Sequence, residues 1–278
     1  MQEELKPEPK RVPPRASDYL NGDSPMKRAK DKLARVLVWI YLHGFSTAEI
    51  IREVSGQKAR GYARRLAKAG YLVETKTESG GFIRSVPVYY YTLSLNGLQE
   101  AARHAQVQIP YPELDCWRVD QQLMRHGIIV QELTWSQVRF ELIKEYRTER
   151  MLGVGGDKAK VKRPDAVWTD DDMSKTAIEV ELSGKYDRDL DDFIHKLIEA
   201  LYYDGVGTGR YGRFFIFSDQ QKLLDRYKAA MLPGAPLSVW AKSARNRWEK
   251  HKTEEVPDWL CKQVHFLLYP NFIPTSHL

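Results

Sequence analysis

Apolar residues recur at helical spacing through the first quarter of the chain, in segments separated by glycines that end the predicted helices. Leu33, Leu37 and Ile40 share one face of a helix that we expect over residues 25–43, ended by Gly44. The pattern continues with a short helix capped by Ser46 or Thr47 and a third helix over residues 57–69. Two alternating segments, residues 71–73 and 86–93, flank a polar turn and predict a β-hairpin. One more helix is expected at residues 97–105.

A second set of elements follows a proline-containing linker at residues 106–112. We expect an amphipathic helix over residues 114–144, a hairpin of strands at 166–168 and 176–182, and a helix at 187–203. An apolar strand at 213–217, a helix at 223–231 and a last strand at 264–268 complete the set. Residues 245–252 are rich in Lys and Arg, and the sequence fits a basic DNA-binding patch and a solvated helix equally well here. The predicted organisation is a basic, disordered arm (residues 1–25), a first domain (26–106) and a second domain (107–278).

The strand at residues 176–182 carries an unusual alternation. Ile178, Val180 and Leu182 point to one face, while Glu179 and Glu181 point with Ala177 to the other. Carboxylates on an otherwise apolar strand are costly to bury unless a positive group pairs with them. The pattern therefore predicts either a metal or ion-pair site or, as the simpler alternative, a hairpin whose acidic face meets solvent.

Composition bounds the class of protein. The chain has 278 residues and a formal net charge of +6, which suits a polyanionic partner. Its two cysteines, Cys116 and Cys261, make a disulfide framework or a thiolate zinc site improbable. The sequence predicts no membrane span and no apolar signal core, and we expect a cytoplasmic, bacterial protein.

Positive charge is concentrated in the third predicted helix. Its basic residues are Lys58, Arg60, Arg64, Arg65 and Lys68. Helix, short helix, basic helix and hairpin in this order resemble a winged helix-turn-helix, which lays its third helix in the major groove of double-stranded DNA. The resemblance makes these five residues the expected DNA contacts.

The acidic hairpin resembles the PD-(D/E)xK motif of restriction-endonuclease-like nucleases, with Pro164-Asp165 followed by Glu179-x-Glu181. The expected fold is α/β: an N-terminal winged helix-turn-helix followed by a restriction-endonuclease-like α/β/α domain. Asp165 and Glu179 would bind Mg²⁺ or Mn²⁺, which prefer oxygen ligands. Glu181 stands where the motif commonly has lysine. Lys185 would reach the same site if the strand continued through Gly184, and spacing leaves open whether Glu181 or Lys185 is the general base.

The first helix of this fold often contributes another acid. Glu132 and Glu141 are the candidates, and Glu132 is the one we select.

Together, the winged helix and the Arg163-Pro164-Asp165 and Glu179-Val180-Glu181-Leu182-x-x-Lys185 phrases resemble the replication-relaxation family and its MobC-type plasmid relaxases. That resemblance implies a protein that nicks DNA at a plasmid transfer origin during conjugative mobilisation, with an accessory or coupling protein as partner. The alternatives are a non-catalytic DNA-binding regulator of plasmid replication or transcription, and a restriction nuclease. No two histidines have the His-x-His spacing of rolling-circle relaxases, which excludes that type.

Overall fold

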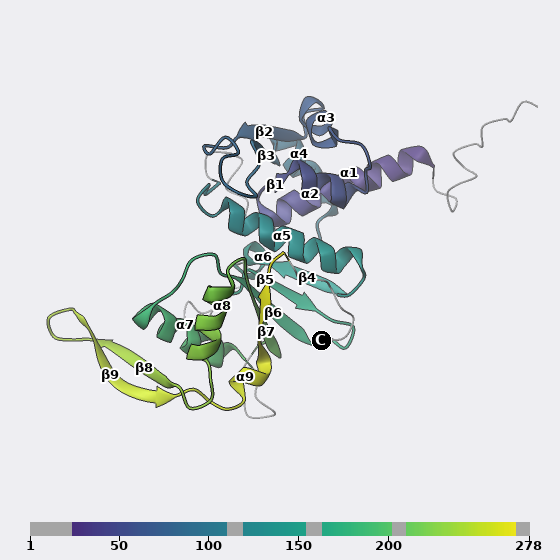
Figure 1. Cartoon of the computed structure of the whole chain (residues 1–278). Coiled ribbons are helices and arrows are strands. Elements are labelled where there is room, and N and C mark those ends of the chain that lie inside the picture. The colour runs from purple at the N-terminus through teal and green to yellow at the C-terminus, as the bar shows by residue number, and fades with distance from the viewer. Residues whose placement is uncertain (1–23, 110–118, 154–162, 202–209, 271–278) are drawn as a thin grey trace, which may run out of the picture.

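The protein is described by a computed structural model that covers residues 24–109, 119–153, 163–201 and 210–270 (Figure 1). It is a mixed α/β structure with two larger sheets and a projecting two-stranded ribbon. The expected N-terminal arm, apart from its last two residues, and residues 110–112 of the expected linker lie outside the described residues. No helix within the described part is both long and apolar enough to cross a bilayer.

The first half is a helical layer on a small sheet. Helix α1 (Pro25–His43) starts after the Ser24 cap and ends at Gly44, whose φ is 88°. Thr47 caps α2 (Ala48–Ser55), as expected, and α3 (Tyr62–Lys68), β2 (Leu72–Lys76), β3 (Tyr89–Leu93) and α4 (Leu95–His104) follow. Strand β1 (Ser46–Thr47) was not expected, and the sheet order is β1-β3-β2.

The third helix is shorter than the sequence predicted. Gly61 has a φ of 86° and immediately precedes α3, so the helix begins at Tyr62 rather than at residue 57. A left-handed residue interrupts a helix because its backbone cannot continue the right-handed hydrogen-bond ladder. The basic residues Lys58 and Arg60 therefore lie in the α2–α3 turn and not on the helix.

The second half is built on a five-stranded sheet of order β10-β7-β6-β5-β4. Strands β4 (Glu145–Thr148), β5 (Ala166–Thr169) and β6 (Lys175–Val180) form an antiparallel meander, whereas β6, β7 (Arg213–Ser218) and β10 (Val264–Leu268) are parallel. Helix α5 (Met124–Arg139) packs Ile129, Val130 and Leu133 on one face of this sheet. Helices α7 (Asp187–Ala200) and α8 (Gln221–Ala230) pack on the other, which makes a three-layered half.

The second half differs from the sequence prediction in three places. The helix predicted over residues 114–144 is confined, within the described residues, to α5, because residues 119–123 form bends and turns and residues 140–144 end the helix. Residues 145–152, for which no element was predicted, form β4 and α6 (Glu149–Leu152). The basic region near residue 250 is a ribbon of β8 (Pro236–Lys242) and β9 (Trp248–Glu255), followed by α9 (Leu260–Gln263), and not a solvated helix.

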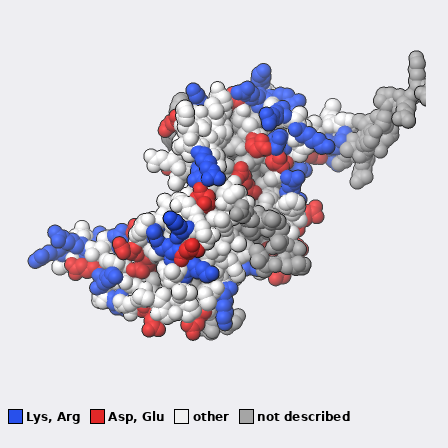
Figure 2. Space-filling model, viewed as in Figure 1, with Lys and Arg blue, Asp and Glu red and all other residues white. Residues whose placement is uncertain are grey.

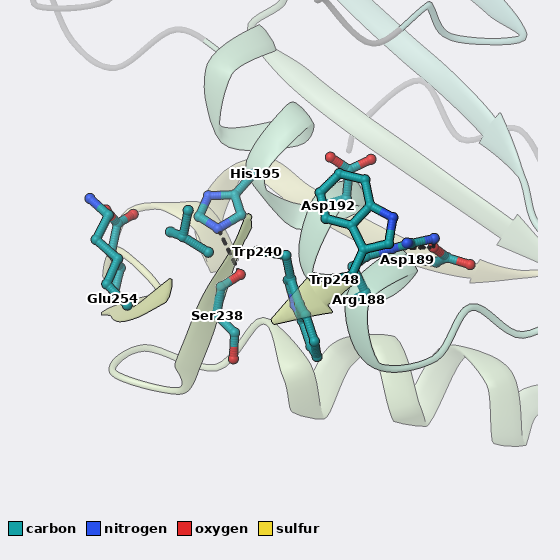
Figure 3. Close-up of a pocket in the computed structure, with 10 residues that line it drawn as sticks. Arg188, Asp189, Asp192, His195, Ser238, Trp240, Trp248 and Glu254 are labelled. Carbon is teal, nitrogen blue, oxygen red and sulfur yellow. Dashed lines mark hydrogen bonds and ion pairs between the residues drawn. The ribbon is translucent and has the colours of Figure 1, made fainter. Parts of the chain in front are cut away.

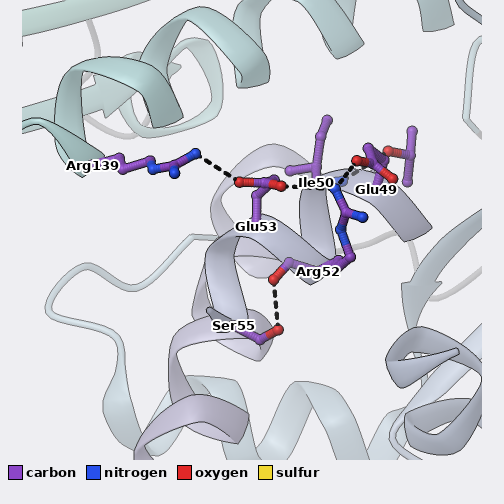
Figure 4. Close-up of polar contacts among 7 residues, drawn as sticks. Glu49, Ile50, Arg52, Glu53, Ser55 and Arg139 are labelled. Atoms are coloured by element: carbon purple, nitrogen blue, oxygen red, sulfur yellow. Dashed lines mark hydrogen bonds and ion pairs between the residues drawn. The ribbon is translucent and has the colours of Figure 1, made fainter. Parts of the chain in front are cut away.

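Helix α5 also joins the two halves. Met124 and Ile128 belong to the same apolar core as α1, α2 and β3, and Gln131 accepts a hydrogen bond of 2.9 Å from the indole of Trp39. At the far end of α5, Arg139 pairs with Glu53 of α2, which Arg52 also contacts (Figure 4). Apolar and ionic contacts thus connect the first half to α5, which packs on the five-stranded sheet.

Candidate functional site: an acidic cluster at the end of β6

Asp165 lies where β5 begins, directly beside β6. Its backbone N–H donates to the carbonyl of Ile178 at 2.9 Å, and its Oδ2 accepts from the N–H of Val180 at 2.7 Å. The strand register pairs Ala166 with Ile178, so the next position along places Asp165 opposite Glu179. The backbone register thus makes the two expected metal ligands neighbours across the hairpin.

Glu179 of β6 and Glu181, directly after the strand, are both buried. Glu179 is 4% exposed and Glu181 is 5% exposed. Ile178 and Val180 pack toward α5, while the neighbouring Ala177 packs toward α7, as the alternation predicted. The simpler alternative, an acidic face open to solvent, is therefore wrong, and these carboxylates require compensation from nearby groups.

Lys185 provides that compensation for Glu181. Strand β6 ends at Val180, so it does not continue through Gly184, which was the condition for Lys185 to reach the site along the strand. The loop nevertheless brings Lys185 back, and its Nζ forms an ion pair with Oε1 of Glu181 and lies 4.7 Å from the ring centroid of Phe193. A buried carboxylate and a partly buried ammonium hold this loop against α7.

Tyr227 of α8 lies behind the ion pair. Its hydroxyl accepts from the backbone N–H of Lys185 at 3.0 Å and donates to Oε2 of Glu181 at 3.4 Å. Burial, and then the charge of Glu181, raise the pKa of Tyr227. The hydroxyl therefore stays protonated near neutral pH and remains a donor to the carboxylate.

His126 was not among the expected site residues. It projects from the first turn of α5, and its Nε2 lies 3.0 Å from Oδ2 of Asp165. Burial lowers the pKa of His126, but the hydrogen bond and charge of Asp165, helped by Glu149 and Glu181, leave the pKa above its ordinary value. Asp165 thus has a charged or hydrogen-bonding partner on the helix side. No spacing rule joins two residues so far apart in the chain, and only the packing of α5 on the sheet reveals this pair.

The acid chosen from α5 lies elsewhere. Glu132 accepts a hydrogen bond from the hydroxyl of Tyr269, and burial raises its pKa. Six residues separate it from His126, which is about 9 Å along the helix axis. Asp165 contacts the histidine end of α5, and Glu132 forms its hydrogen bond with the segment that follows β10.

A small cavity of about 80 Å³ adjoins Asp165 on the side of the first half. It is lined by residues of α1, α5, β4, α6 and the β5 start, among them His43, His126, Glu149 and Asp165. Among the described residues, no group of three or more His, Cys, Asp or Glu side chains is arranged to hold a metal ion. A divalent ion here would depend on Asp165 and Glu179, with the remaining oxygens from the backbone, water or substrate.

That donor set fits Mg²⁺ or Mn²⁺. Mg²⁺ is commonly bound through one or two carboxylates while it retains several waters. A divalent cation bound between two carboxylates offsets their mutual repulsion. Oδ2 of Asp165 already accepts two hydrogen bonds, so Oδ1 of Asp165 and the carboxylate of Glu179 are the oxygens that suit an ion.

The expected DNA contacts are exposed but differ in setting. Arg64 pairs with Glu74 through a 3.1 Å contact and lies over the Tyr89 ring, so α3 is tied to the strands β2 and β3. Arg65 lies 5.4 Å from the ring centroid of Tyr62. Arg64, Arg65 and Lys68 remain on α3, and the region that contains them carries many Lys and Arg side chains in Figure 2.

Comparison with known proteins adds one similarity. No family model matches the chain, and no curated protein matches it. The chain is similar to the solved structure of protein VC1899 from Vibrio cholerae, with 14% identity and a TM-score of 0.28 over 75% of this chain and 51% of that one. The chain thus spans about half the length of that protein.

Proposed function

We propose that the protein is a Mg²⁺- or Mn²⁺-dependent DNA endonuclease of the plasmid relaxase kind, which nicks one strand at a transfer origin. The observation that supports the proposal is that Glu179 and Glu181 are both buried, with Asp165 beside Glu179 in the hairpin register and Lys185 paired with Glu181. Two buried glutamates beside an aspartate are expensive to maintain in a fold that does not use them. Such clusters occur preferentially at functional sites.

The arrangement of the elements supports a nuclease with its own DNA-binding half. The order α1–β1–α2–α3–β2–β3, with the sheet β1-β3-β2, is the order expected of a winged helix-turn-helix. The order α5–β4–β5–β6–α7–β7, with an antiparallel meander followed by a parallel strand, is that expected of a restriction-endonuclease-like core. Both halves suit a protein that recognises a duplex and cuts it.

Each residue of the cluster has a role in this proposal. Asp165 and Glu179 hold the divalent ion, which when bound neutralises charge on the scissile phosphate and helps to make a water nucleophilic. His126 fixes the orientation of Asp165 through the 3.0 Å contact. Lys185, released from Glu181 toward the substrate, stabilises charge on the phosphate or orients the attacking water.

The test is a nicking assay on supercoiled DNA. A duplex sequence selected by its binding to the full chain is cloned into a supercoiled plasmid, which is incubated with protein and Mg²⁺. We expect open-circle product from the wild type, and at least about a hundredfold less from an Asp165→Asn, Glu179→Gln variant. Asp171→Asn, in the exposed β5–β6 turn, is the matched control and should cut normally. Equal product from the wild type and the double variant excludes a catalytic site here.

One observation favours a second function, a non-catalytic DNA-binding regulator. His126 and the Val180 N–H already satisfy Oδ2 of Asp165, and Lys185 already pairs with Glu181, so the cluster also serves the fold without metal. A regulator of this kind binds its duplex equally well with Mg²⁺ or with a chelator present, and its affinity falls steeply with salt. Specific binding without any nicking of the selected plasmid would favour this function.

A further inference from the structure

A cavity of about 560 Å³ lies between helix α7 and the β8–β9 ribbon (Figure 3). Its walls combine two indole rings with cations and carboxylates. Trp240 and Trp248 come from the ribbon, and Arg188 and His195 come from α7. None of these residues belongs to the acidic cluster described above.

The ribbon is held in place although little of it is buried. Every residue of β9 is exposed, and β9 pairs only with β8 among the described strands. A two-stranded ribbon alone is at best marginally stable in water. Here the indole N–H of Trp240 donates to Asp191 at 2.8 Å, and His195 lies 3.3 Å from the carbonyl of Ser238. Helix α7 thus fixes a projecting surface.

Trp248 forms the exposed aromatic centre of that surface. Its side chain belongs to a residue that is 48% exposed, a large fraction for tryptophan in a folded chain. The Arg188 guanidinium lies 4.8 Å and the Lys242 ammonium 5.6 Å from its ring centroid. In the same way, Lys250 lies 5.4 Å from the Trp240 ring. Indole rings flanked by cations are the arrangement on which unpaired bases stack while their phosphates meet positive charge.

Charge is distributed unevenly along the ribbon. The exposed cations at and near its outer end are Lys242, Arg245, Arg247 and Lys250, with Glu249 as the acid among them. Figure 2 shows this outer end as a group of Lys and Arg side chains. Asp189, Asp192 and Glu254 also line the cavity, and they pair with Arg188, Lys196 and Lys252. Phosphates are therefore favoured at the outer end, where cations outnumber the acid.

The aromatic part of the cavity is connected to the acidic cluster through the start of α7. Arg188 lies in the first turn of α7, three residues after Lys185. Trp248 is bound to that same turn through its contact with Arg188. A strand that leaves the acidic cluster past Lys185 would next meet Arg188 and Trp248.

We propose that the β8–β9 ribbon and α7 bind an unpaired segment of DNA beside the cleavage site, with a base stacked on Trp248 and phosphates on the outer cations. This inference rests on the proposed function for its location, but binding at the ribbon is measured separately. A duplex keeps its base faces stacked on each other, so Trp248 selects single strands. The ribbon would hold one strand open or displaced while the winged half holds the duplex.

The test compares single-stranded and duplex DNA on the full chain. Fluorescence anisotropy is measured with a labelled oligo(dT) of about twelve nucleotides, which lies within the span of one single-strand site, and with a duplex of equal length. We expect Trp248→Ala to weaken oligo(dT) binding about tenfold and to leave duplex binding unchanged. Trp248→Phe should retain most of the affinity, because stacking needs an aromatic face rather than the indole N–H.

Phe140→Ala is the matched control. Phe140 is 59% exposed and has the Arg139 guanidinium 5.7 Å from its ring centroid, but it lies at the end of α5. An oligo(dT) affinity that is unmeasurable in the wild type, or equal in Trp248→Ala and Phe140→Ala, overturns the proposal. So does a tenfold loss of duplex binding in Trp248→Ala, which would make the ribbon a duplex clamp.

The two proposals fail separately. If the protein binds oligo(dT) through Trp248 but does not nick DNA, single-strand binding by the ribbon is supported and the endonuclease proposal is excluded. If the protein nicks DNA normally but Trp248→Ala binds oligo(dT) like the wild type, the endonuclease proposal is supported and single-strand binding by the ribbon is excluded.

Discussion

The Glu181–Lys185 pair shows how single residues stabilise this fold. Glu181 is 5% exposed, and its partner Lys185 has a side chain that is 32% exposed. Removing one member of a buried pair leaves an uncompensated charge, which usually costs more than the pair contributes. The ion pair therefore matters for stability whether or not the site is catalytic.

Replacement of the lysine alone should destabilise the protein. We expect Lys185→Met to lower the free energy of unfolding by about 2 kcal/mol, less than for fully buried pairs because Lys185 is partly exposed. Glu181→Gln in the Lys185→Met background should recover more than half of that loss, since no charge then remains buried. Urea unfolding of the single and double variants measures both effects. Equal losses in the two variants would contradict this account.

His43 is a second residue whose charge state affects stability. Burial, and then the charge of Arg150, lower its pKa to about 3. Its ring packs at a tilt against Trp39, 4.4 Å between centroids, and stacks on Tyr146 at 6.1 Å. In the unfolded chain the pKa is about 6.5. Between these values the unfolded state binds more protons, so stability is complete above about pH 6.5 and falls as the pH drops toward 3.

The prediction concerns the pH slope of stability. From pH 6.5 to pH 4, His43 should reduce the free energy of unfolding by at most about 1.4 kcal/mol for each pH unit. His43→Phe keeps an aromatic ring in the stack but cannot titrate, so its stability should fall less steeply over this range. Chemical unfolding at a series of pH values gives both slopes. Parallel slopes would show that His43 does not titrate in this way.

At the scale of elements, the hydrophobic pattern located most helices and strands, and local backbone geometry changed their ends. Helix α3 is only 7 residues long because Gly61 adopts a positive φ. Strand β4 escaped prediction because two of its four residues, Glu145 and Arg147, are charged and only Thr148 is buried. Strand β9 has no buried residue at all, and its register with β8 is what makes it a strand.

The shortened α3 gives a prediction for the proposed duplex binding. Removing a cation that touches one phosphate reduces the dependence of log affinity on log salt by about 1. We expect Arg65→Ala, Lys68→Ala to lower that slope by about 2, because both cations lie on α3 and neither forms an ion pair among the contacts described for this helix. The measurement is a salt titration of duplex binding.

Arg103→Ala is the matched control for that titration. Arg103 is a 71% exposed cation that pairs with Glu100 on α4, away from the α2–α3 turn. Its removal should leave the slope unchanged. If the α3 variant has the wild-type slope, duplex DNA does not contact α3.

At the scale of the whole molecule, α5 links the two halves into one structure. It contributes Ile128 to the core of the first half, and Ile129 and Val130 to the core of the sheet. Thr148 of β4 also donates to the carbonyl of Leu42 at 2.7 Å, at the end of α1. These contacts make independent unfolding of the two halves unfavourable.

A mutation in α5 should therefore weaken both halves together. Ile128 is 2% exposed, and Ile128→Ala is expected to cost about 2 to 4 kcal/mol. Native-state hydrogen exchange should show equal losses of protection in α1 and in β7, although only α1 shares a core with Ile128. Ile83→Ala, at a residue that is 48% exposed, should change neither region. A loss confined to α1 would mean that the halves unfold separately.

The sequence by itself determined the β5–β6 hairpin, its acidic alternation, and the basic third helix, because strand and helix periods are local properties of the chain. It also predicted that Asp165 and Glu179 are neighbours across the hairpin, since a hairpin register needs only two neighbouring strands. Tertiary structure alone decided that His126 rather than Glu132 meets Asp165, that Tyr227 supports the Lys185 loop, and that Trp248 meets Arg188. Those contacts join segments far apart in sequence, and they arise only when helices pack on the sheet and bury the charges between them.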